Sequence, residues 1–412
     1  MLDDSKFWPE GCSRCKPGPF IVWLLFCLGL LGWALVSAFL VLYKGLNQTG
    51  MNDYYAFGLW IVVDLAVIAL GAGAFFTGFL TFIVGKKELR NIVNAAVVIG
   101  FICYSGAILM LGIDIGQPIR GWFGFWHANV HSMLTEVMFC ITTYLIVLII
   151  EFVPLILSNR QIKKIEELDL FGHHLHRIVI VFAATGTFLS FFHQGSLGGL
   201  YGVLYGRPFL YRTGIAIWPW TFFLFILSAI ASGPSFTTLI VMLTEKVSGR
   251  QLTSHKVKML MGKISGWLLA VYVVLKGADT LYWLFVQTPA KGIDWHSFYQ
   301  LSYGQWLLFA ELGIGGVLPA IMLLSPAVRE SYPMLALAML LNCFGAVMNR
   351  FVMTIQGLAI PVLPFEKYIT YLPTWQEWGI TAGVIAYGFI VFSLAYRYLP
   401  LFPQERRLNP AK

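Results

Sequence analysis

Charged residues are scarce in this 412-residue chain. Lys, Arg, Asp and Glu together make up 12% of it, about half the usual share for a soluble globular protein. Hydrophobic residues account for 58%, aromatic residues for 16%, and the mean hydropathy is +0.74. A soluble protein of this length has too much surface to cover with so few charges. The composition therefore excludes a soluble multidomain protein and predicts one that crosses a membrane several times.

Other familiar signatures are also missing. The six cysteines form no secreted disulfide framework, and four of them lie inside apolar runs. Cys12 and Cys15 supply only half of a zinc site, so two reduced thiols are the simpler interpretation. No phosphate loop, dinucleotide fingerprint or nucleophile elbow occurs where a strand and a helix would present it. The membrane segments are therefore the main source of functional information.

Ten apolar segments reach the length of about 20 residues that crosses the hydrocarbon core. We expect helices in all of them, because an open strand would leave its backbone unpaired in lipid. They cover residues 20–43, 58–84, 92–113, 128–157, 175–195, 217–244, 258–284, 303–325, 333–357 and 377–398. The first is too long for a signal-peptide core and is expected to stay as a signal anchor. The predicted fold class is an all-α polytopic membrane protein.

The basic residues predict the orientation of these spans. With the N-terminus inside, 20 Lys and Arg residues fall in inner segments and six in outer segments, including Lys367. This asymmetry follows the positive-inside rule, so the net charge of +8 is no nucleic-acid footprint. We expect a bacterial inner-membrane protein with both termini cytoplasmic. The outer loops are rich in Trp, Tyr, Gly and Pro, which suits a docking surface, although membrane-interface belts also enrich Trp and Tyr.

A weak internal repeat predicts two bundles of four helices. Gly73-Ala-Phe-Phe-Thr77 aligns with Gly233-Pro-Ser-Phe-Thr237 at an offset of 160. With small changes of offset, three further pairs align: Asp114 with Asp279, Glu136 with Glu311, and Gln194 with Gln356. We therefore divide the chain into a cytoplasmic segment (1–19), a peripheral span (20–43), a first bundle (58–195), a second bundle (217–357), a peripheral span (377–398) and a cytoplasmic tail (399–412).

Ionisable side chains inside the spans carry chemical information, because burying one in a bilayer is costly unless it is paired or hydrated. The first bundle has four near its outer end: Asp64, Asp114, Glu136 and His193. The second bundle has four at similar depth: Lys276, Asp279, Glu311 and Arg350. Any single acid can simply reach the water at the membrane surface. Four groups of mixed type at one depth in the first bundle predict a polar pocket open to the outer side.

The histidines allow two interpretations. His127 and His131 are spaced i, i+4 and would share a helix face at the outer mouth of the fourth span, as metal or haem ligands do. A b-type haem, however, needs histidines on two facing helices well inside the membrane. The three histidines within residues 173–176 lie in a basic inner loop, and His193 stands alone. Interfacial hydrogen bonding is therefore favoured for His127 and His131, with haem binding as the open alternative.

Three stretches form a recognisable set: Val130-His-Ser-Met-Leu-Thr-Glu136, Ile150-Glu-Phe-Val-Pro154 and Phe192-His-Gln-Gly-Ser-Leu-Gly198. Shorter matches at residues 59–64, 112–114 and 348–351 extend the likeness over spans 2–9. Together they resemble the NrfD/PsrC family of membrane quinone-interacting subunits, most closely its HybB-type members. The lead Phe7-Trp-Pro-Glu-Gly-Cys12 and the overall length are most similar to the membrane subunits of Qrc-type menaquinone reductase complexes.

The resemblance implies a subunit of an oxidoreductase that takes menaquinone as its substrate near the outer face. It implies no haem, metal or iron–sulfur cluster in this chain. Electrons would come from a four-cluster ferredoxin-like iron–sulfur subunit on the periplasmic side. In a Qrc-like complex that subunit would be fed by a multihaem cytochrome c and a molybdopterin-oxidoreductase-like subunit.

Within such a site, His193 is the best expected donor to a quinone carbonyl, because an imidazole can both donate and relay protons. Four residues are expected around it: Asp64, Asp114, Glu136 and Gln194. The second-bundle groups are expected to be structural or part of an ion path, without touching the quinone ring. There Lys276 can pair with Asp279 at i, i+3, and Glu311 with Arg350 if their spans pack together.

The fourth span suggests a proton route from the cytoplasm. Glu136 lies near its outer side, Thr142 and Tyr144 in the middle, and Glu151 toward the inner side. The two glutamates are 15 residues apart, about 22 Å along a helix, so waters and neighbouring hydroxyls would have to bridge them. Alternatively, Glu151 faces the inner headgroups and the threonines bond their own helix backbone.

Two other functions remain open. A secondary transporter also combines internal repeats with buried carboxylates. Here, however, spans 2 and 6 both run from outside to inside, so the repeats are parallel, and discontinuous midplane helices are not evident. A purely structural anchor for extracytoplasmic redox subunits is the second alternative. Bound menaquinone in the purified complex would separate the quinone hypothesis from both.

Overall fold

The computed structural model describes residues 4–207, 209–292, 294–300, 303–359 and 370–409. Helices dominate this part of the chain, and its strands are one two-residue pair, β1 (Gly214–Ile215) and β2 (Trp218–Pro219). Nine of its helical stretches are long and apolar enough to cross a membrane. Helix α7 makes a tenth if its two arms, bent by 54°, count as one span. The prediction of an all-α polytopic protein is confirmed.

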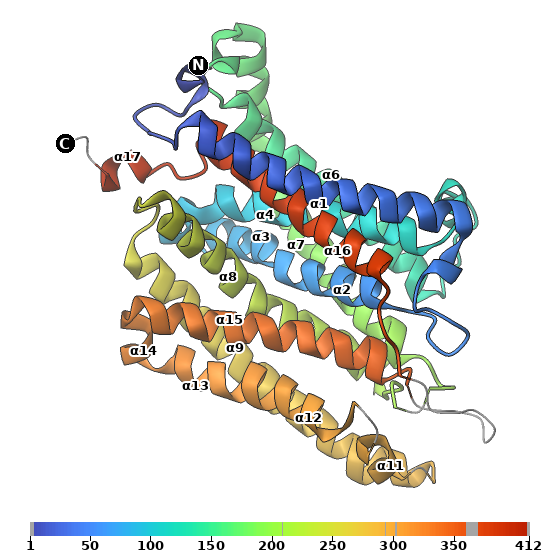
Figure 1. Ribbon diagram of the computed structural model, residues 1–412. Helices are drawn as coiled ribbons and strands as arrows, with labels where there is room; N and C mark the ends of the chain where they lie inside the picture. Colours follow the sequence, from blue (N-terminus) through green and yellow to red (C-terminus); the bar gives the residue numbers. More distant parts are fainter. Residues whose placement is uncertain (1–3, 208, 293, 301–302, 360–369, 410–412) are drawn as a thin grey trace.

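Successive long helices run in alternating directions (Figure 1). The α-helices are α1 (Pro17–Lys44), α2 (Leu59–Gly71), α3 (Gly73–Gly78), α4 (Arg90–Asp114), α5 (Phe123–Trp126), α6 (Met133–Leu157), α7 (Glu166–Gly202), α8 (Trp220–Ser248), α9 (His255–Tyr282), α10 (Thr288–Ala290), α11 (Trp295–Gln300), α12 (Gly304–Leu308), α13 (Leu318–Leu324), α14 (Pro326–Glu330), α15 (Tyr332–Phe351), α16 (Trp375–Tyr398) and α17 (Glu405–Leu408). Four π-helical segments continue long helices: η3 (Phe79–Ile83), η7 (Trp283–Gln287), η8 (Phe309–Val317) and η9 (Val352–Gln356). Single 3-10 turns lie at η1 (Ser5–Phe7), η2 (Leu46–Gln48), η4 (Lys87–Leu89), η5 (Pro118–Arg120) and η6 (Ile162–Lys164).

Both termini lie at the same end of the molecule (Figure 1), here named the termini end; the opposite end is the loop end. Helices α1 and α16 pack along each other at one side and against α4. Next come α2, α3, α4, α6 and α7, and beyond them α8, α9, α13 and α15. Helix α8 contacts α2, α3 and α7 and so joins the two groups. The division into bundles at 58–195 and 217–357 stays a prediction. Residues 360–369 of the predicted outer loop, Lys367 among them, lie outside the described residues.

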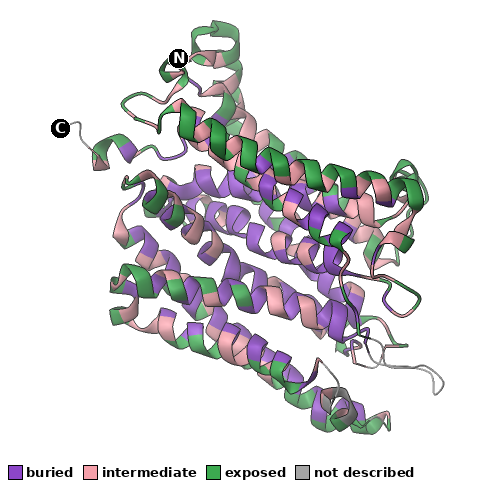
Figure 2. Ribbon diagram, in the orientation of Figure 1, coloured by how far each residue is buried: buried purple, intermediate pink, exposed green. Residues whose placement is uncertain are grey.

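Burial differs strongly between the peripheral helices and the centre (Figure 2). In the most apolar stretch of α1 only 17% of the residues are buried, whereas in that of residues 59–83 the share is 83%. Large apolar side chains of α1, such as Val22, Leu35 and Phe39, are exposed. In a bilayer such side chains face lipid, so α1 lies at the periphery and α2 in the protein interior.

The two copies of the repeated motif pack against each other. A Cβ atom on Gly73 would overlap the carbonyl oxygen of Gly233 and the Oγ1 atom of Thr237. A Cβ atom on Gly233 would in turn overlap the backbone nitrogen of Gly73. Only glycine permits such an approach between helices. The aligned motifs therefore meet at a close crossing of α3 and α8, beside the break between α2 and α3.

Candidate functional site

His193 lies in the last third of α7, toward the loop end, and is fully buried. Neither imidazole nitrogen has a hydrogen-bond partner among the described residues. The ring packs beside that of Tyr104 on α4, with centroids 5.7 Å apart. Buried imidazole nitrogens are normally hydrogen-bonded. Both nitrogens of His193 are therefore available to a ligand or to water.

Two buried hydroxyl groups near His193, those of Tyr104 and Ser190, were not predicted from the sequence. Gln194 donates its side-chain amide to the carbonyl of Ile68 on α2 (3.0 Å) and approaches the Tyr104 hydroxyl (3.4 Å). The Tyr104 hydroxyl shares a 2.8 Å hydrogen bond with Ser190 Oγ on α7. Tyr104 and Ser190 are uncharged, so a search for ionisable residues in apolar spans passed over them. Their only sequence signal is a hydroxyl inside an otherwise apolar segment.

The structure brings Asp64 and Asp114 to the same region. Asp64 on α2 is buried, Asp114 ends α4 half-buried, and Oδ1 of each has no hydrogen-bond partner among the described residues. Both carboxyl groups lie within electrostatic range of the buried hydroxyl of Tyr201, which hydrogen-bonds Thr354 Oγ1 of η9 (3.0 Å). Glu136 is half-buried on α6, and no hydrogen bond described here joins it to either aspartate. The two aspartates therefore lie together near the last turns of α7.

The start of α16 closes this region at the loop end. Glu377 is fully buried and accepts hydrogen bonds from the backbone of Gly50 (2.8 Å) and Thr374 (2.9 Å) and from the Tyr371 hydroxyl. The Tyr371 oxygen accepts a further bond from the backbone of Leu59 (2.6 Å). Burial and the Glu377 carboxylate raise the pKa of Tyr371, so its hydroxyl stays a donor. Although α16 is peripheral, hydrogen bonds through Glu377 and Tyr371 join the segment at Gly50, the segment that leads into α16 and the start of α2.

In the second bundle, the predicted pair of Lys276 and Asp279 is present, with Nζ and Oδ2 3.8 Å apart. Arg212, from the connection before α8, also donates to Asp279 Oδ2 at 3.3 Å. All three side chains are buried. Burial lowers the pKa of Arg212, and the Asp279 charge opposes that effect. Sequence reasoning missed Arg212, because a loop residue carries no periodicity that would place it.

The expected ion pair between Glu311 and Arg350 is replaced by a bridge. Glu311 accepts hydrogen bonds from Tyr272 (3.3 Å) and from the amide of Asn349 (2.8 Å). The guanidinium of Arg350 donates to the amide oxygen of Asn349 and stacks 3.8 Å from the Phe225 ring centroid. Among the described residues no direct ion pair joins the two charges. The Asn349 amide satisfies both at once, which helix spacing did not reveal.

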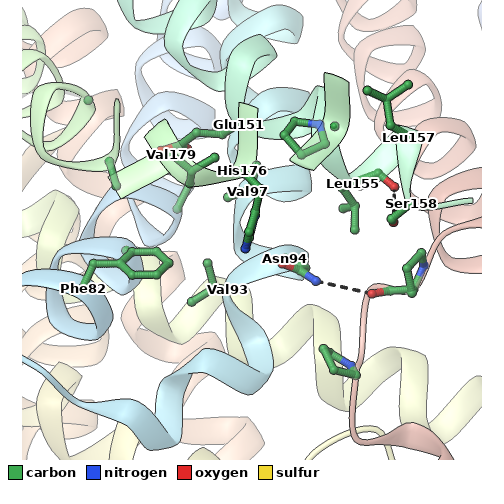
Figure 3. Close-up of a pocket in the computed structure, with 18 of the residues that line it drawn as sticks. Phe82, Val93, Asn94, Val97, Glu151, Leu155, Leu157, Ser158, His176 and Val179 are labelled. Atoms are coloured by element: carbon green, nitrogen blue, oxygen red, sulfur yellow. Dashed lines mark hydrogen bonds between the residues drawn. The ribbon is translucent and has the colours of Figure 1, made fainter. Parts of the chain in front are cut away.

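A cavity of about 360 Å³ lies toward the termini end between α3, α4, α6 and α7 (Figure 3). Glu151 and His176 line one wall, and Asn94, which bonds the carbonyl of Pro400 (3.3 Å), lines another. Tyr144 is the lining residue of α6 farthest from the termini end, and its buried hydroxyl has no partner among the described residues. Of the predicted proton route, Glu151 and Tyr144 line this cavity, whereas Thr142 and Glu136 do not.

Two further expectations concern metal ligands. His127 and His131 do not share a helix face, because α6 begins only at Met133, and both are exposed. Cys12 and Cys15 are free thiols, and burial raises the pKa of Cys12. In the described ranges no three His, Cys, Asp or Glu side chains gather as a metal-binding group.

The chain matches the family described as Polysulphide reductase, NrfD, over residues 47–362. It is 54% identical over 408 residues to the menaquinone reductase integral membrane subunit of Nitratidesulfovibrio vulgaris, a match that covers 98% of this chain and 97% of that protein. It is 23% identical to the Hdr-like menaquinol oxidoreductase integral membrane subunit of Archaeoglobus fulgidus (87% and 89% covered). It is also 23% identical to the probable Ni/Fe-hydrogenase 2 b-type cytochrome subunit of Escherichia coli (87% and 86% covered). Each similarity spans both halves of the chain.

Proposed function

The chain belongs to the NrfD family of polysulphide reductase proteins, as its motifs indicated, and we propose from this premise that it is the membrane subunit of a menaquinone reductase complex. The observation that carries the proposal is His193, a buried imidazole of the first bundle with neither nitrogen partnered among the described residues. The relative at 54% identity, named a menaquinone reductase subunit, supports the choice of substrate.

The residues around His193 fit the needs of a quinone. Such a ligand requires a donor to its carbonyl oxygens and an apolar channel for its isoprenoid tail. A neutral imidazole supplies the donor and can pass on a proton. The side-chain oxygen of the neighbouring Gln194 has no hydrogen-bond partner among the described residues, and the buried apolar residues Leu65 and Leu197 come from the two helices that carry Asp64 and His193. We assign Asp64 and Asp114 to proton supply or to tuning the charge of the site, and Glu136 to its rim.

Electrons reach this chain from outside, in our proposal, through a four-cluster iron–sulfur subunit. That subunit docks on the loop end, which faces the periplasm if both termini lie in the cytoplasm of a bacterial inner-membrane protein. Exposed apolar side chains at the loop end, such as Ile119, Trp126 and Val130, suit such a contact. In a Qrc-like assembly the electron supply is completed by a multihaem cytochrome c and a molybdopterin-oxidoreductase-like subunit.

Protons are taken up from the termini end in this proposal. The cavity with Glu151 on its wall and Tyr144 at its depth provides the entry. Because the electrons arrive from the opposite side, each turnover would separate charge across the membrane.

The test is the quinone content and the visible spectrum of the purified native complex. We expect about one menaquinone per complex after solvent extraction, and no haem b spectrum from the isolated membrane subunit. Haem b in the isolated subunit would contradict the proposal. The proposal would be supported if the native complex reduces added quinone and if quinone binding is lost when this subunit is removed.

A further inference from the structure

A second cavity, here named the α8–α9 pocket, lies at the termini end where α8 turns into α9 beside the start of α15 (Figure 1). Its volume is about 410 Å³, and six side chains on its wall matter for what it can bind: Glu245, Lys246, Arg250, His255, Lys258 and Tyr332. We propose that this pocket binds the phosphate headgroup of an anionic phospholipid from the surrounding membrane. The inference is independent of the quinone site and requires only that the chain spans a bilayer.

The carboxylate on the pocket wall, Glu245, is already occupied by the protein. It pairs with Lys258 and accepts hydrogen bonds from the backbone of Leu252 (2.9 Å) and Thr253 (3.0 Å). The Tyr332 hydroxyl donates to it as well, at 3.3 Å. Lys258 therefore balances the charge of Glu245, and the other two cations of the pocket remain for a ligand.

Those two cations lack a matching negative charge. Lys246 is exposed near the end of α8, and it forms no hydrogen bond or ion pair with the described residues. Arg250 is half-buried and shares the Glu405 carboxylate with Arg14. Arg14 bonds both oxygens of that carboxylate, at 2.6 and 3.0 Å, whereas Arg250 lies 3.4 Å from one of them. One carboxylate between two guanidinium groups leaves an excess of positive charge, which a phosphate group would balance.

The amino end of α9 adds to this attraction. The helix is 28 residues long and begins at His255 on the pocket wall. Its N-cap residue, Ser254, makes no side-chain cap hydrogen bond, so the first N–H groups of the helix present their partial positive charge to a ligand. The Nε2 atom of His255 is held 3.0 Å from the carbonyl oxygen of Glu330, which orients the ring. Side chains and helix end thus favour an anion at the same place.

An exposed apolar strip beside the pocket favours a lipid over a soluble anion. Leu243 and Val247 on α8 are 50% and 82% exposed and lie within one turn of Lys246. On a membrane-spanning helix such side chains face acyl chains. Since α8 ends at Ser248, the pocket lies where the span leaves the membrane, at the depth of lipid headgroups. A phospholipid can place its phosphate among the cations and its chains along the strip, whereas inorganic phosphate can use the cations alone.

Exposed basic residues elsewhere at the termini end lack this arrangement. Lys86 and Lys87 are exposed in the connection between η3 and α4, and they line neither of the two cavities described here. They carry the same charge as Lys246 on the same side of the membrane. Lys87 therefore provides a matched control for the general attraction of basic loops to anionic membranes.

The experiment uses the intact purified complex, stripped of bound lipid in detergent. Cardiolipin, phosphatidylglycerol, phosphatidylcholine or inorganic phosphate is added, and binding is measured by native mass spectrometry together with the shift in the thermal unfolding temperature. The pocket variants are Lys246→Gln, Lys246→Glu and the charge-conserving Lys246→Arg, and the control is Lys87→Gln. Assembly is not expected to suffer, because Lys246 is exposed and makes no contact with the described residues that folding would require.

We expect cardiolipin and phosphatidylglycerol to bind the wild type more tightly than phosphatidylcholine does, and to raise its unfolding temperature. Lys246→Gln should lose about fivefold of the affinity for anionic lipid, as for one cation at a membrane surface. Lys246→Glu should lose more, and Lys246→Arg should bind as the wild type does. The Lys87 control should stay within about twofold of the wild type.

Three results would overturn the proposal. Unchanged lipid affinity in both Lys246→Gln and Lys246→Glu would show that the pocket is not the binding site. An equal loss in Lys87→Gln would reduce the effect to general surface attraction. If inorganic phosphate binds the wild type and protects it as well as the anionic lipids do, and loses that effect in Lys246→Gln, the pocket serves a soluble anion instead of a lipid.

Discussion

The two bundles differ in how their buried ionisable side chains are partnered. In the first, His193, Asp64 and Tyr144 each present a buried polar atom without a partner among the described residues. In the second, Asp279 lies between two cations and one amide joins Glu311 to Arg350, so each of these charged groups has at least one partner, although Nε of Arg350 has none among the described residues. Unpartnered buried groups cost free energy unless a ligand or water satisfies them, whereas saturated groups mainly fix the packing. The difference favours the first bundle as the place of the proposed ligand and the second as a scaffold beside it.

The largest effect is expected from breaking the buried cluster of Arg212, Lys276 and Asp279. Asp279→Asn would leave Arg212 and Lys276 buried without a counter-charge, and we expect a loss of about 3–5 kcal/mol in the free energy of unfolding. Thermal unfolding of the purified complex measures it, and turnover per assembled complex should stay near the wild-type value. Asp294→Asn, which alters an exposed pair with His296, is the control and should change little. Lost turnover without lost stability would place the second bundle in the reaction.

The next largest effect is expected at His193, the unpartnered imidazole of the first bundle. His193→Ala should leave the complex assembled but lower quinone reduction roughly a hundredfold, because a donor to the developing negative charge on the substrate is lost. Ile355→Ala, at the equivalent position of the second bundle, should leave the rate within about threefold while reducing stability by a few kcal/mol. The rates are measured with an external electron donor. A wild-type rate in the His193 variant would reject the assignment.

A smaller effect is expected at the entry to the proton route. Glu151→Gln should slow the build-up of membrane potential in liposomes by about tenfold, since a group that can exchange protons is lost from the cavity wall. Glu167→Gln, an exposed position on α7, serves as the control and should behave as the wild type. If the wild-type complex generates no potential, cytoplasmic uptake is wrong.

The smallest effect should be equal in the two halves. Thr77 and Thr237 occupy equivalent repeat positions, and each buries a hydroxyl without a partner among the described residues. Replacing either by valine removes an unsatisfied group, so we expect changes within about 1 kcal/mol of unfolding free energy. A much larger loss at one of them, seen in thermal unfolding, would show that its hydroxyl binds something and that the halves differ there too.

Much of the fold could be predicted because it depends on composition. The first span was expected at 20–43, and the structure has α1 at Pro17–Lys44, since runs of apolar residues alone decide what enters lipid. The fifth span was underestimated: 175–195 was expected, but α7 runs from Glu166 to Gly202. Its first turns carry charged residues and histidines, so hydropathy does not register them although they are helical.

The site was predicted in part. His193, Asp64, Asp114 and Gln194 could be chosen because ionisable or amide groups are costly within an apolar span and so attract attention. Tyr104 and Ser190 could not, because a lone hydroxyl can satisfy itself on its own helix backbone, as Thr143 does. Whether it does so or reaches a neighbouring helix depends on how each helix is rotated about its axis.

The sequence by itself determined that this protein is a bundle of membrane-spanning helices, because span length is a property of the chain; the two related halves remain a prediction from its internal similarity. Only the tertiary structure decided that Gly73 meets Gly233 at the crossing of the halves, that Asn349 bridges Glu311 and Arg350, and that Tyr104 bonds Ser190. Apart from the neighbours Asn349 and Arg350, those contacts join residues at least 38 positions apart. They are set by the rotation and depth at which helices pack, and a pattern of residues along one helix holds no record of either.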